Sequence, residues 1–448
     1  MSPRTLPPKF IAERLADVFV AGRVEAPAAL DRLSAVLGHR HPWLATLTNE
    51  LCVQFGSGVR PRPAPVVAAI LESETFGKVL RRQRIQIPPH VELHDAMVPI
   101  PALAEARVPS ILSREALAEW LGVSVEQLLW LADPGYRERQ PESEPLQHYR
   151  YTWRTKRHGV RRLIESPKPT LKAMQRRVLK EILDRIPPHT AAHGFCRGRS
   201  LQSFVAPHVG RDFVLAIDLE AFFASVGVPR VRAVYRAAGY PDGVACLLAG
   251  LSTNVPPKSL WNIPGRVGSS PKERWIYDRP HLPQGAPTSP ALANLCAFGL
   301  DRRLRGLADW AGAQYTRYAD DIVFSGGAEF RRRAERVHVY AASIAGDEGF
   351  RLNTRKTRRL TRSMRQVVAG IVVNDRTNVR REDYDRLKAT LTNCIRHGPE
   401  SQNRDDHCDF RNHLLGRVSW IASLNAERGQ RLRKLFDQIV WSDDDSAG

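Results

Sequence analysis

Two adjacent aspartates, Asp320 and Asp321, lie between two short apolar segments that have the composition of β-strands. Residues 314–324 therefore predict a hairpin whose tight turn is Tyr318-Ala319-Asp320-Asp321. Neighbouring carboxylates repel each other, and one of them would normally be protonated unless a divalent cation is bound. A surface turn is the common alternative for an isolated pair of aspartates. The apolar residues on both sides favour a metal site instead.

A third carboxylate, Asp218, ends a continuous apolar run over residues 212–218, which predicts a buried strand. Three carboxylates from separate strands can hold two Mg²⁺ ions about 3.5–4 Å apart. Such a pair of ions activates an attacking hydroxyl and stabilises a leaving pyrophosphate. The residues therefore predict nucleotidyl transfer, with Asp218, Asp320 and Asp321 as the catalytic and metal-binding groups.

The charge balance indicates the kind of partner. The chain has 67 Lys and Arg against 47 Asp and Glu, a formal charge of +20, which attracts polyanions such as nucleic acid. Residues 150–185 carry twelve basic residues against three acidic ones, and residues 354–366 carry six and none. A solvated protein face is the alternative interpretation of such basic runs.

The composition, 43% hydrophobic and 25% charged residues, is that of a folded globular protein, and 448 residues suggest two to four domains. No run of eighteen apolar residues is present, and the first ten residues have no apolar signal core. Six scattered cysteines without a C-x-x-C pair are typical of reduced intracellular thiols. We therefore expect a cytoplasmic protein that does not bind a membrane.

The remaining patterns predict mainly helices. Residues 1–110 contain short apolar stretches separated by prolines, which indicates a helical extension with stiff connectors. Residues 149–164 alternate around a turn at Lys156–Gly159 and predict a hairpin. Helices are expected over Ser113–Trp120 and Ser124–Leu131, capped by Ser113 and by a Ser124–Gln127 capping box, and over Leu171–Ile186, Ser289–Leu304, Arg381–His397 and Phe410–Phe436.

Three segments in order resemble the reverse transcriptases. Tyr318-Ala319-Asp320-Asp321 resembles their catalytic box, and Asp218-Leu219-Glu220-Ala221-Phe222-Phe223 resembles their first aspartate segment. Residues 282–290, Leu-Pro-Gln-Gly-Ala-Pro-Thr-Ser-Pro, match the template-and-nucleotide segment of retron and group II intron enzymes. The resemblance extends over roughly residues 149–440, and three coordinated motifs are far more specific than one.

Other segments resemble the retron enzymes in particular, in the style of the myxobacterial enzymes with long N-termini. They are Ala191-Ala192-His193-Gly194-Phe195, Gly198-Arg199-Ser200 and residues 365–374. The chain also departs from the retron pattern. Residues 204–208 keep only the histidine of N-A-x-x-H, and Val368-Ala369-Gly370 replaces V-T-G. In the family these segments contact the cognate RNA, so the departures concern recognition of a standard retron RNA and not the polymerase core.

The resemblance assigns roles to individual residues. Lys156 and Arg162 match the residues that grip the nucleotide triphosphate, and Phe223 matches an aromatic ring that excludes a ribose hydroxyl. Gly285 allows the backbone to approach the incoming base pair, and Gln284 can hydrogen-bond beside it. Leu219 would offer a metal its backbone carbonyl. Lys356 matches a lysine near the leaving phosphate, although a solvated basic loop is equally compatible with its sequence.

Contacts with RNA are expected along the basic segment, at Arg355, Arg358, Arg359 and Arg362, and at His208. For His208 an ordinary hydrogen-bonded histidine is an equal alternative. One ring of the Phe222–Phe223 pair is expected to be core.

The resemblance implies an α+β right-hand polymerase with an antiparallel palm sheet. The expected divisions are a helical extension at 1–110, fingers at 111–210, a palm at 211–375 and a helical thumb at 376–448. The implied partners are a structured noncoding RNA that serves as template and primer, deoxynucleotides, two Mg²⁺ ions and the RNA–DNA hybrid product. Synthesis of RNA-linked single-stranded DNA (msDNA), an effector protein and antiphage defence are also implied.

Three alternatives stay open. One is a defence reverse transcriptase that makes DNA without a retron RNA. Another is a group II intron-like enzyme, disfavoured because only about 78 residues follow Gly370, too few for added maturation domains. The third, from another class, is an inactive RNA-binding scaffold, which the intact Asp218, Asp320 and Asp321 disfavour.

Overall fold

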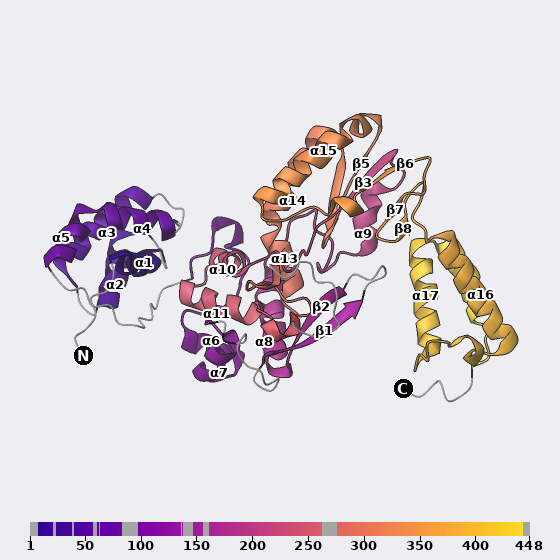
Figure 1. Ribbon diagram of the computed structural model, residues 1–448, viewed down its shortest axis with the longest axis horizontal. Coiled ribbons are helices and arrows are strands. Elements are labelled where there is room, and N and C mark those ends of the chain that lie inside the picture. The colour runs from indigo at the N-terminus through magenta and orange to yellow at the C-terminus, as the bar shows by residue number, and fades with distance from the viewer. Residues whose placement is uncertain are drawn as a thin grey trace. The chain divides into compact units, whose positions relative to one another are not determined.

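The computed structural model describes residues 8–20, 24–37, 40–56, 61, 63–82, 97–135, 137, 147–155, 161–261 and 276–441. Its helices and antiparallel sheets, drawn in Figure 1, confirm the α+β class. The chain forms two compact units, each assembled from segments distant in sequence. The first comprises Met1–Pro187 and Phe223–Cys296, and the second comprises Pro188–Phe222 and Ala297–Gly448.

The first unit begins with five helices that share a core of their own. They are α1 (Pro8–Phe19), α2 (Ala26–Leu37), α3 (Pro42–Phe55), α4 (Pro63–Glu72) and α5 (Glu74–Arg82), coloured indigo to purple in Figure 1. Leu15, Leu33 and Leu44 are fully buried in this core. Arg32 is also buried and donates hydrogen bonds to the carbonyls of Val18 (3.2 Å) and Phe19 (3.0 Å). These bonds satisfy carbonyls that the end of α1 would otherwise leave unpaired.

The next two helices of this unit begin at the capping residues that the sequence predicts. Ser113 accepts a hydrogen bond from the Ala116 backbone at the start of α6 (Arg114–Leu121). Ser124 and Gln127 form the predicted capping box of α7 (Val125–Ala132). These helices pack against α11 (Asp242–Ser252), which packs in turn on α10 (Val228–Ala237). The predicted caps are thus confirmed.

A two-stranded antiparallel hairpin follows, formed by β1 (Tyr149–Thr155) and β2 (Arg161–Pro167). Lys156, in the predicted turn, lies outside the described residues. The next predicted helix ends earlier than expected: α8 covers Pro169–Glu181, and a 3-10 turn then covers Leu183–Arg185. Pro187 and Pro188 lack backbone donors and cannot continue the helix.

The second unit is built around a four-stranded antiparallel sheet, here called the central sheet, with the order β4-β5-β3-β6. Its strands are β3 (Phe213–Asp218), β4 (Gln314–Tyr318), β5 (Asp321–Gly326) and β6 (Arg358–Thr361). On one face, α14 (Phe298–Ala311) contacts β4, and α15 (Ala328–Asp347) contacts β3 and β5. Val214, Ala216 and Val323 belong to the core cluster that the C-terminal helices share. Burial on both faces explains why β3 is apolar throughout.

The prediction of a single helix over Ser289–Leu304 is wrong. Residues 289–311 form α13 (Ser289–Cys296) and α14, separated at Ala297, where the chain passes from one unit to the other. The two helices pack on different partners, α13 on α10 and α14 on α15, so one straight helix could not bury both apolar faces. The Ser289 hydroxyl donates to the carbonyl of Pro283 (2.7 Å) instead of capping the helix.

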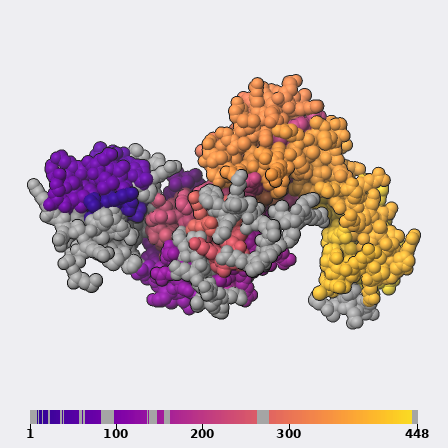
Figure 2. Space-filling model, in the orientation of Figure 1, coloured from indigo at the N-terminus to yellow at the C-terminus, as the bar shows by residue number. Residues whose placement is uncertain are grey.

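The C-terminal helices complete the second unit. α16 covers Arg381–His397, as predicted, whereas the predicted helix over 410–436 is divided into α17 (Phe410–Leu424) and α18 (Ala426–Phe436). Asn425 separates them, and its side chain caps α18 by accepting from the Arg428 backbone. Figure 2 shows α16 and α17 (yellow) as one packed body. A short hairpin, β7 (Val367–Val368) and β8 (Ile371–Val372), precedes them.

No helix among the described residues is both long and apolar enough to cross a membrane.

Two N-terminal deletions test whether the five-helix core is independent. Removing residues 1–82 should leave the rest of the protein stable, because the core of α1–α5 is formed by their own side chains. Removing residues 1–105 also deletes the backbone bonds from Val98 to Gly239 (3.1 Å) and from Ile100 to Ala237 (2.9 Å). We expect this longer deletion to lower the melting temperature by about 1–4 °C relative to the shorter one.

The melting temperature of each protein can be followed by circular dichroism. Both deletions remove the electrostatic contact of Asp17 with Arg236, so that contact cancels in the comparison. Equal melting temperatures for the two deletions, or an insoluble product of the shorter one, would contradict the interpretation.

Candidate active site

The structure brings the three aspartates to one end of the central sheet. Tyr318 pairs with Asp321, so the hairpin between β4 and β5 has a two-residue loop, Ala319 and Asp320. Asp321 begins β5 and stands directly opposite Asp218, the last residue of β3. The backbone carbonyl of Asp320 accepts a hydrogen bond from the Leu219 amide (2.9 Å). Strand pairing thus gathers residues that lie far apart in the sequence.

The loop that carries Asp320 has a strained backbone. Ala319 has a φ of +55°, in the left-handed region that residues other than glycine rarely occupy. Of the two loop residues, only Ala319 has a positive φ, as in a type II′ turn, whose first loop position prefers glycine. Gly194 lies against this loop, because a Cβ there would be 2.8 Å from the Ala319 amide nitrogen. The surrounding structure therefore restrains the turn closely.

The electrostatics of the site reflect its crowded carboxylates. Burial, followed by the charges of Asp320 and Asp218, raises the pKa of Asp321 to about 6. The charges of Arg358 and Lys356 act in the opposite direction. The carboxyl is thus harder to ionise than an ordinary aspartate, as expected for like charges across paired strands.

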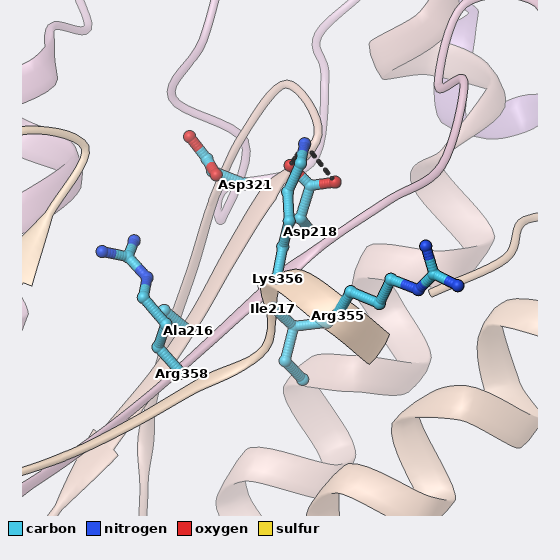
Figure 3. A pocket seen from close by; sticks show the side chains of 7 residues that line it. All are labelled: Ala216, Ile217, Asp218, Asp321, Arg355, Lys356 and Arg358. Atoms are coloured by element: carbon cyan, nitrogen blue, oxygen red, sulfur yellow. Dashed lines mark hydrogen bonds and ion pairs between the residues drawn. The ribbon is translucent and has the colours of Figure 1, made fainter. Parts of the chain in front are cut away.

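A pocket at this end of the sheet is lined by both acidic and basic residues, namely Ala216, Ile217, Asp218, Asp321, Arg355, Lys356 and Arg358. In Figure 3 the Lys356 ammonium reaches both carboxylate oxygens of Asp218, at 2.7 and 3.0 Å. Arg355 and Arg358 extend to opposite sides of the pocket (Figure 3). Lys356 therefore neutralises Asp218 in this structure.

The donor set suits a hard divalent cation, because Asp218, Asp320 and Asp321 supply carboxylate oxygens and crowd one another. Among the described residues, no three His, Cys, Asp or Glu side chains are grouped to hold a metal. Since Lys356 is bonded to both carboxylate oxygens of Asp218, a cation that binds Asp218 would compete with this ammonium.

In the first unit, the structure brings together β2 and the segment that contains Gln284 and Gly285. The Glu165 amide donates to the Gln284 carbonyl (2.9 Å). Gly285 has a φ of +132°, and a Cβ there would be 2.9 Å from the Glu165 carbonyl oxygen. Glycine is thus required by both conformation and space. Arg162 lies half-buried on the same strand, β2.

A buried polar network holds this contact, and sequence reasoning missed it. Glu165 accepts hydrogen bonds from His281 (2.9 Å) and from Asn254 (2.8 Å), and Asn254 also donates to Tyr151 (3.0 Å). Burial alone would lower the pKa of His281, but the charge and hydrogen bond of Glu165 outweigh it and raise the pKa. One feature of the sequence could have indicated this network: Glu165 is one of only three acidic residues in the basic stretch 150–185.

The two adjacent phenylalanines have different surroundings. Phe222 is 4% exposed and stacks on Phe350 with a centroid separation of 5.6 Å. Phe223 is only half-buried. The expectation that one ring of the pair is core is confirmed, whereas the assignment of Phe223 to the nucleotide sugar stays a prediction.

His208 is not at the surface. It is fully buried, and its ring nitrogens lie 2.6 Å from the Ser325 hydroxyl and 2.7 Å from the Thr316 hydroxyl. Burial, followed by the charges of Arg211 and His193, lowers its pKa to about 3, so the ring is neutral. The prediction of an RNA contact at His208 is therefore corrected, because both nitrogens already have partners inside the second unit.

The basic segment is exposed but makes ion pairs. Arg359 binds Glu335 (2.6 Å), and Arg362 binds Asp375 (3.2 Å) and lies 3.7 Å from Asp212. Exposed ion pairs contribute little to stability, typically about 0–1 kcal/mol. Phosphate groups could therefore replace these acidic partners at small cost.

Comparison with known proteins agrees with this geometry. The model of the reverse transcriptase (RNA-dependent DNA polymerase) family matches residues 154–382. The retron Mx65 reverse transcriptase of Myxococcus xanthus is 40% identical over 344 residues, covering 76% of this chain and 75% of that protein. The retron Mx162 reverse transcriptase of the same species is 40% identical over 273 residues, covering 58% of this chain and about half (53%) of that protein.

A third relative is more distant. The retron Ec86 reverse transcriptase of Escherichia coli is 32% identical over 272 residues, covering 60% of this chain and 74% of that protein. The fold and the matched segments define a polymerase of the reverse transcriptase class. Within that class, the chain belongs to the retron-type reverse transcriptases, which are RNA-directed DNA polymerases.

The raised pKa of Asp321 predicts a dependence of stability on pH. The pKa is about 6 in the folded protein against an ordinary value of 3.8, so the folded state binds this proton more tightly. Stability should therefore fall as the pH rises from about 4 to 6 and stay lower above that range. Asp321→Asn should raise stability by about 1–3 kcal/mol at pH 8 and change little below pH 4.

Urea unfolding in the presence of a chelator measures this difference without bound metal. The matched control is Asp309→Asn, at an exposed carboxylate on α14, which should show no such gain. An Asp321→Asn variant that is no more stable than wild type at pH 8 would show that the carboxylates do not repel each other as described.

Proposed function

We propose that this enzyme copies a structured noncoding RNA into RNA-linked single-stranded DNA, with that RNA as both template and primer. The observation that carries the proposal is the position of Asp218, Asp320 and Asp321 at one end of the central sheet, in a chain 40% identical to a retron reverse transcriptase. A role in antiphage defence, with an effector protein, is part of the proposal and rests on the retron relationship alone.

Asp218, Asp320 and Asp321, with the Leu219 carbonyl, would hold two Mg²⁺ ions. When bound, such ions activate the attacking hydroxyl and stabilise the leaving pyrophosphate. Lys356, which lies against Asp218, would neutralise charge beside the leaving phosphate. The arrangement of acidic and basic side chains in one pocket supports this division of roles.

Nucleotide binding is assigned to Lys156 and Arg162 for the triphosphate and to Phe223 for the sugar. Gln284 and Gly285 are assigned to the base pair. The backbone bond between Glu165 and Gln284 supports the idea that β2 and the Gln284–Gly285 segment act together. Deoxynucleotides would be the substrates because the Phe223 ring would exclude a 2′-hydroxyl.

We assign RNA binding to the tip of the β7–β8 hairpin and to four arginines, namely Arg355, Arg358, Arg359 and Arg362. At that tip, Ala369 and Gly370 both have positive φ, +46° and +86°, as in a type I′ turn. Val368-Ala369-Gly370 thus keeps a tight hairpin although its sequence departs from V-T-G. We further assign the palm to 211–375, the fingers to 111–210, the thumb to 376–448 and the extension to 1–110, in a cytoplasmic protein.

The catalytic assignment predicts loss of DNA synthesis in Asp320→Asn/Asp321→Asn. Primer extension on an RNA template should be abolished, while RNA binding stays nearly unchanged because the basic surface is intact.

Analysis of the nucleic acid that copurifies with the enzyme would identify the product. A branched RNA–DNA molecule supports the retron assignment. Free DNA without RNA would favour a different defence polymerase, and DNA synthesis by the double variant would refute the catalytic role.

The assignment of Phe223 to the nucleotide sugar predicts a change in substrate choice. Phe223→Ala should allow incorporation of ribonucleotides, because the smaller side chain leaves room for a 2′-hydroxyl. Phe222→Ala is the matched control, since that neighbouring ring is core and its loss should lower stability without changing substrate choice. Unchanged discrimination in Phe223→Ala would mean that the ring is not the gate.

A further inference from the structure

A fully buried ion pair lies directly behind the turn that carries Asp320. Arg317 on β4 and Asp301 on α14 have side chains with 0% exposure. Two parallel hydrogen bonds join them, from Arg317 Nη2 to Asp301 Oδ2 (2.6 Å) and from Nε to Oδ1 (2.7 Å). The Tyr315 hydroxyl also donates to Asp301 Oδ1 (2.6 Å). The carboxylate is therefore well satisfied.

Stability alone is a weak reason for such a pair. Removing two charges from water has a desolvation cost that often exceeds their attraction, and apolar replacements are often as stable. A buried ion pair can instead specify one arrangement of the chain around it. The question is which arrangement this pair specifies.

A third bond of Arg317 answers this question. Its Nη1 donates to the backbone carbonyl of Ala319 (3.0 Å), the residue whose φ of +55° is strained. Asp320 follows Ala319 directly, so this bond restrains the peptide that leads into the aspartate pair. A strained conformation persists only where its surroundings determine it strongly.

The same guanidinium contacts the second aspartate segment. Its central carbon lies 5.4 Å from the centre of the Phe222 ring. Phe222 lies in the turn that follows Asp218, and Ala221 in that turn also has a positive φ, +46°. One side chain thus contacts both turns that present carboxylates, and Asp301 holds it in one orientation.

We propose that Arg317, oriented by Asp301, is a positioning residue that sets the separation of the three aspartates and thereby their affinity for a divalent cation. The inference rests on the proposed role of these aspartates as metal ligands. Neither residue touches the cation or the nucleotide. Their action passes through the Ala319 carbonyl and the Phe222 ring.

The test separates positioning from stability by removing one or both charges. Arg317→Met leaves Asp301 buried without its partner and should lower the melting temperature. Arg317→Met/Asp301→Asn has no buried charge at this position and keeps an acceptor for Tyr315, so its melting temperature should return toward that of wild type. Arg317→Lys keeps the charge but cannot bind Asp301 and Ala319 together.

The readout is the affinity for Mn²⁺, measured by electron paramagnetic resonance without substrate, together with kcat and KM for deoxynucleotides. Loss of a residue that orients metal ligands typically weakens metal binding by about 10–100-fold. We expect a loss of this size, with reduced kcat, in Arg317→Lys and in the charge-free double variant. The control pair, Arg232→Met/Asp242→Asn in the first unit, should leave Mn²⁺ affinity unchanged.

Recovery of Mn²⁺ affinity together with stability in the double variant would overturn the proposal and make the pair purely structural. Wild-type Mn²⁺ affinity in a folded Arg317→Lys protein would overturn it as well. Failure of the proposed function looks different: Asp320→Asn/Asp321→Asn would then bind Mn²⁺ and synthesise DNA as wild type does.

Discussion

Repulsion between carboxylates is the constraint around which the second unit is organised. Asp218 and Asp321 face each other across β3 and β5, and Asp320 is the next residue along the chain. Such an arrangement is unfavourable without cations nearby. The central sheet, the two-residue loop and the bond of Lys356 to Asp218 bring these charges together and partly neutralise them. The buried Arg317 behind the loop belongs to the same arrangement, since it donates a hydrogen bond to the carbonyl of the strained Ala319.

Local patterns were sufficient to predict the elements that present the aspartates. The apolar run of β3, the β4–β5 hairpin and the limits of α16 follow from periodicity, and the capping box of α7 follows from Ser124 and Gln127. These features depend on residues close together in sequence. The resemblance to retron enzymes, carried by short motifs in a fixed order, is confirmed by the relatives.

Features that depend on distant partners could not be predicted. The helix break at Ala297 arises because α13 and α14 pack on different neighbours, and the break at Asn425 allows α17 and α18 to pack against each other. No local pattern shows either contact. The sequence around His208 does not distinguish a histidine that binds RNA from one that binds two buried hydroxyls. Its partners, Thr316 and Ser325, lie more than 100 residues away in the sequence. Arg317 had a visible signal, a charge within a predicted strand, but its meaning required the position of Asp301. Buried polar networks are therefore the part of this site that sequence patterns describe least.

The interleaving of the two units has a consequence for the order of events during synthesis. β3 leaves the ribosome before its neighbours β5 and β6 exist, since roughly 100 residues separate it from β5, or about 5–20 s of translation. The first unit has all of its segments once Cys296 has emerged, whereas the central sheet cannot close until β6 is complete. During that interval an apolar strand is without its partners. Charges that flank such a strand, here Asp212 and Asp218, disfavour its pairing with other chains. Asp218 of the candidate site therefore also has a physical effect on the nascent chain, before the central sheet exists.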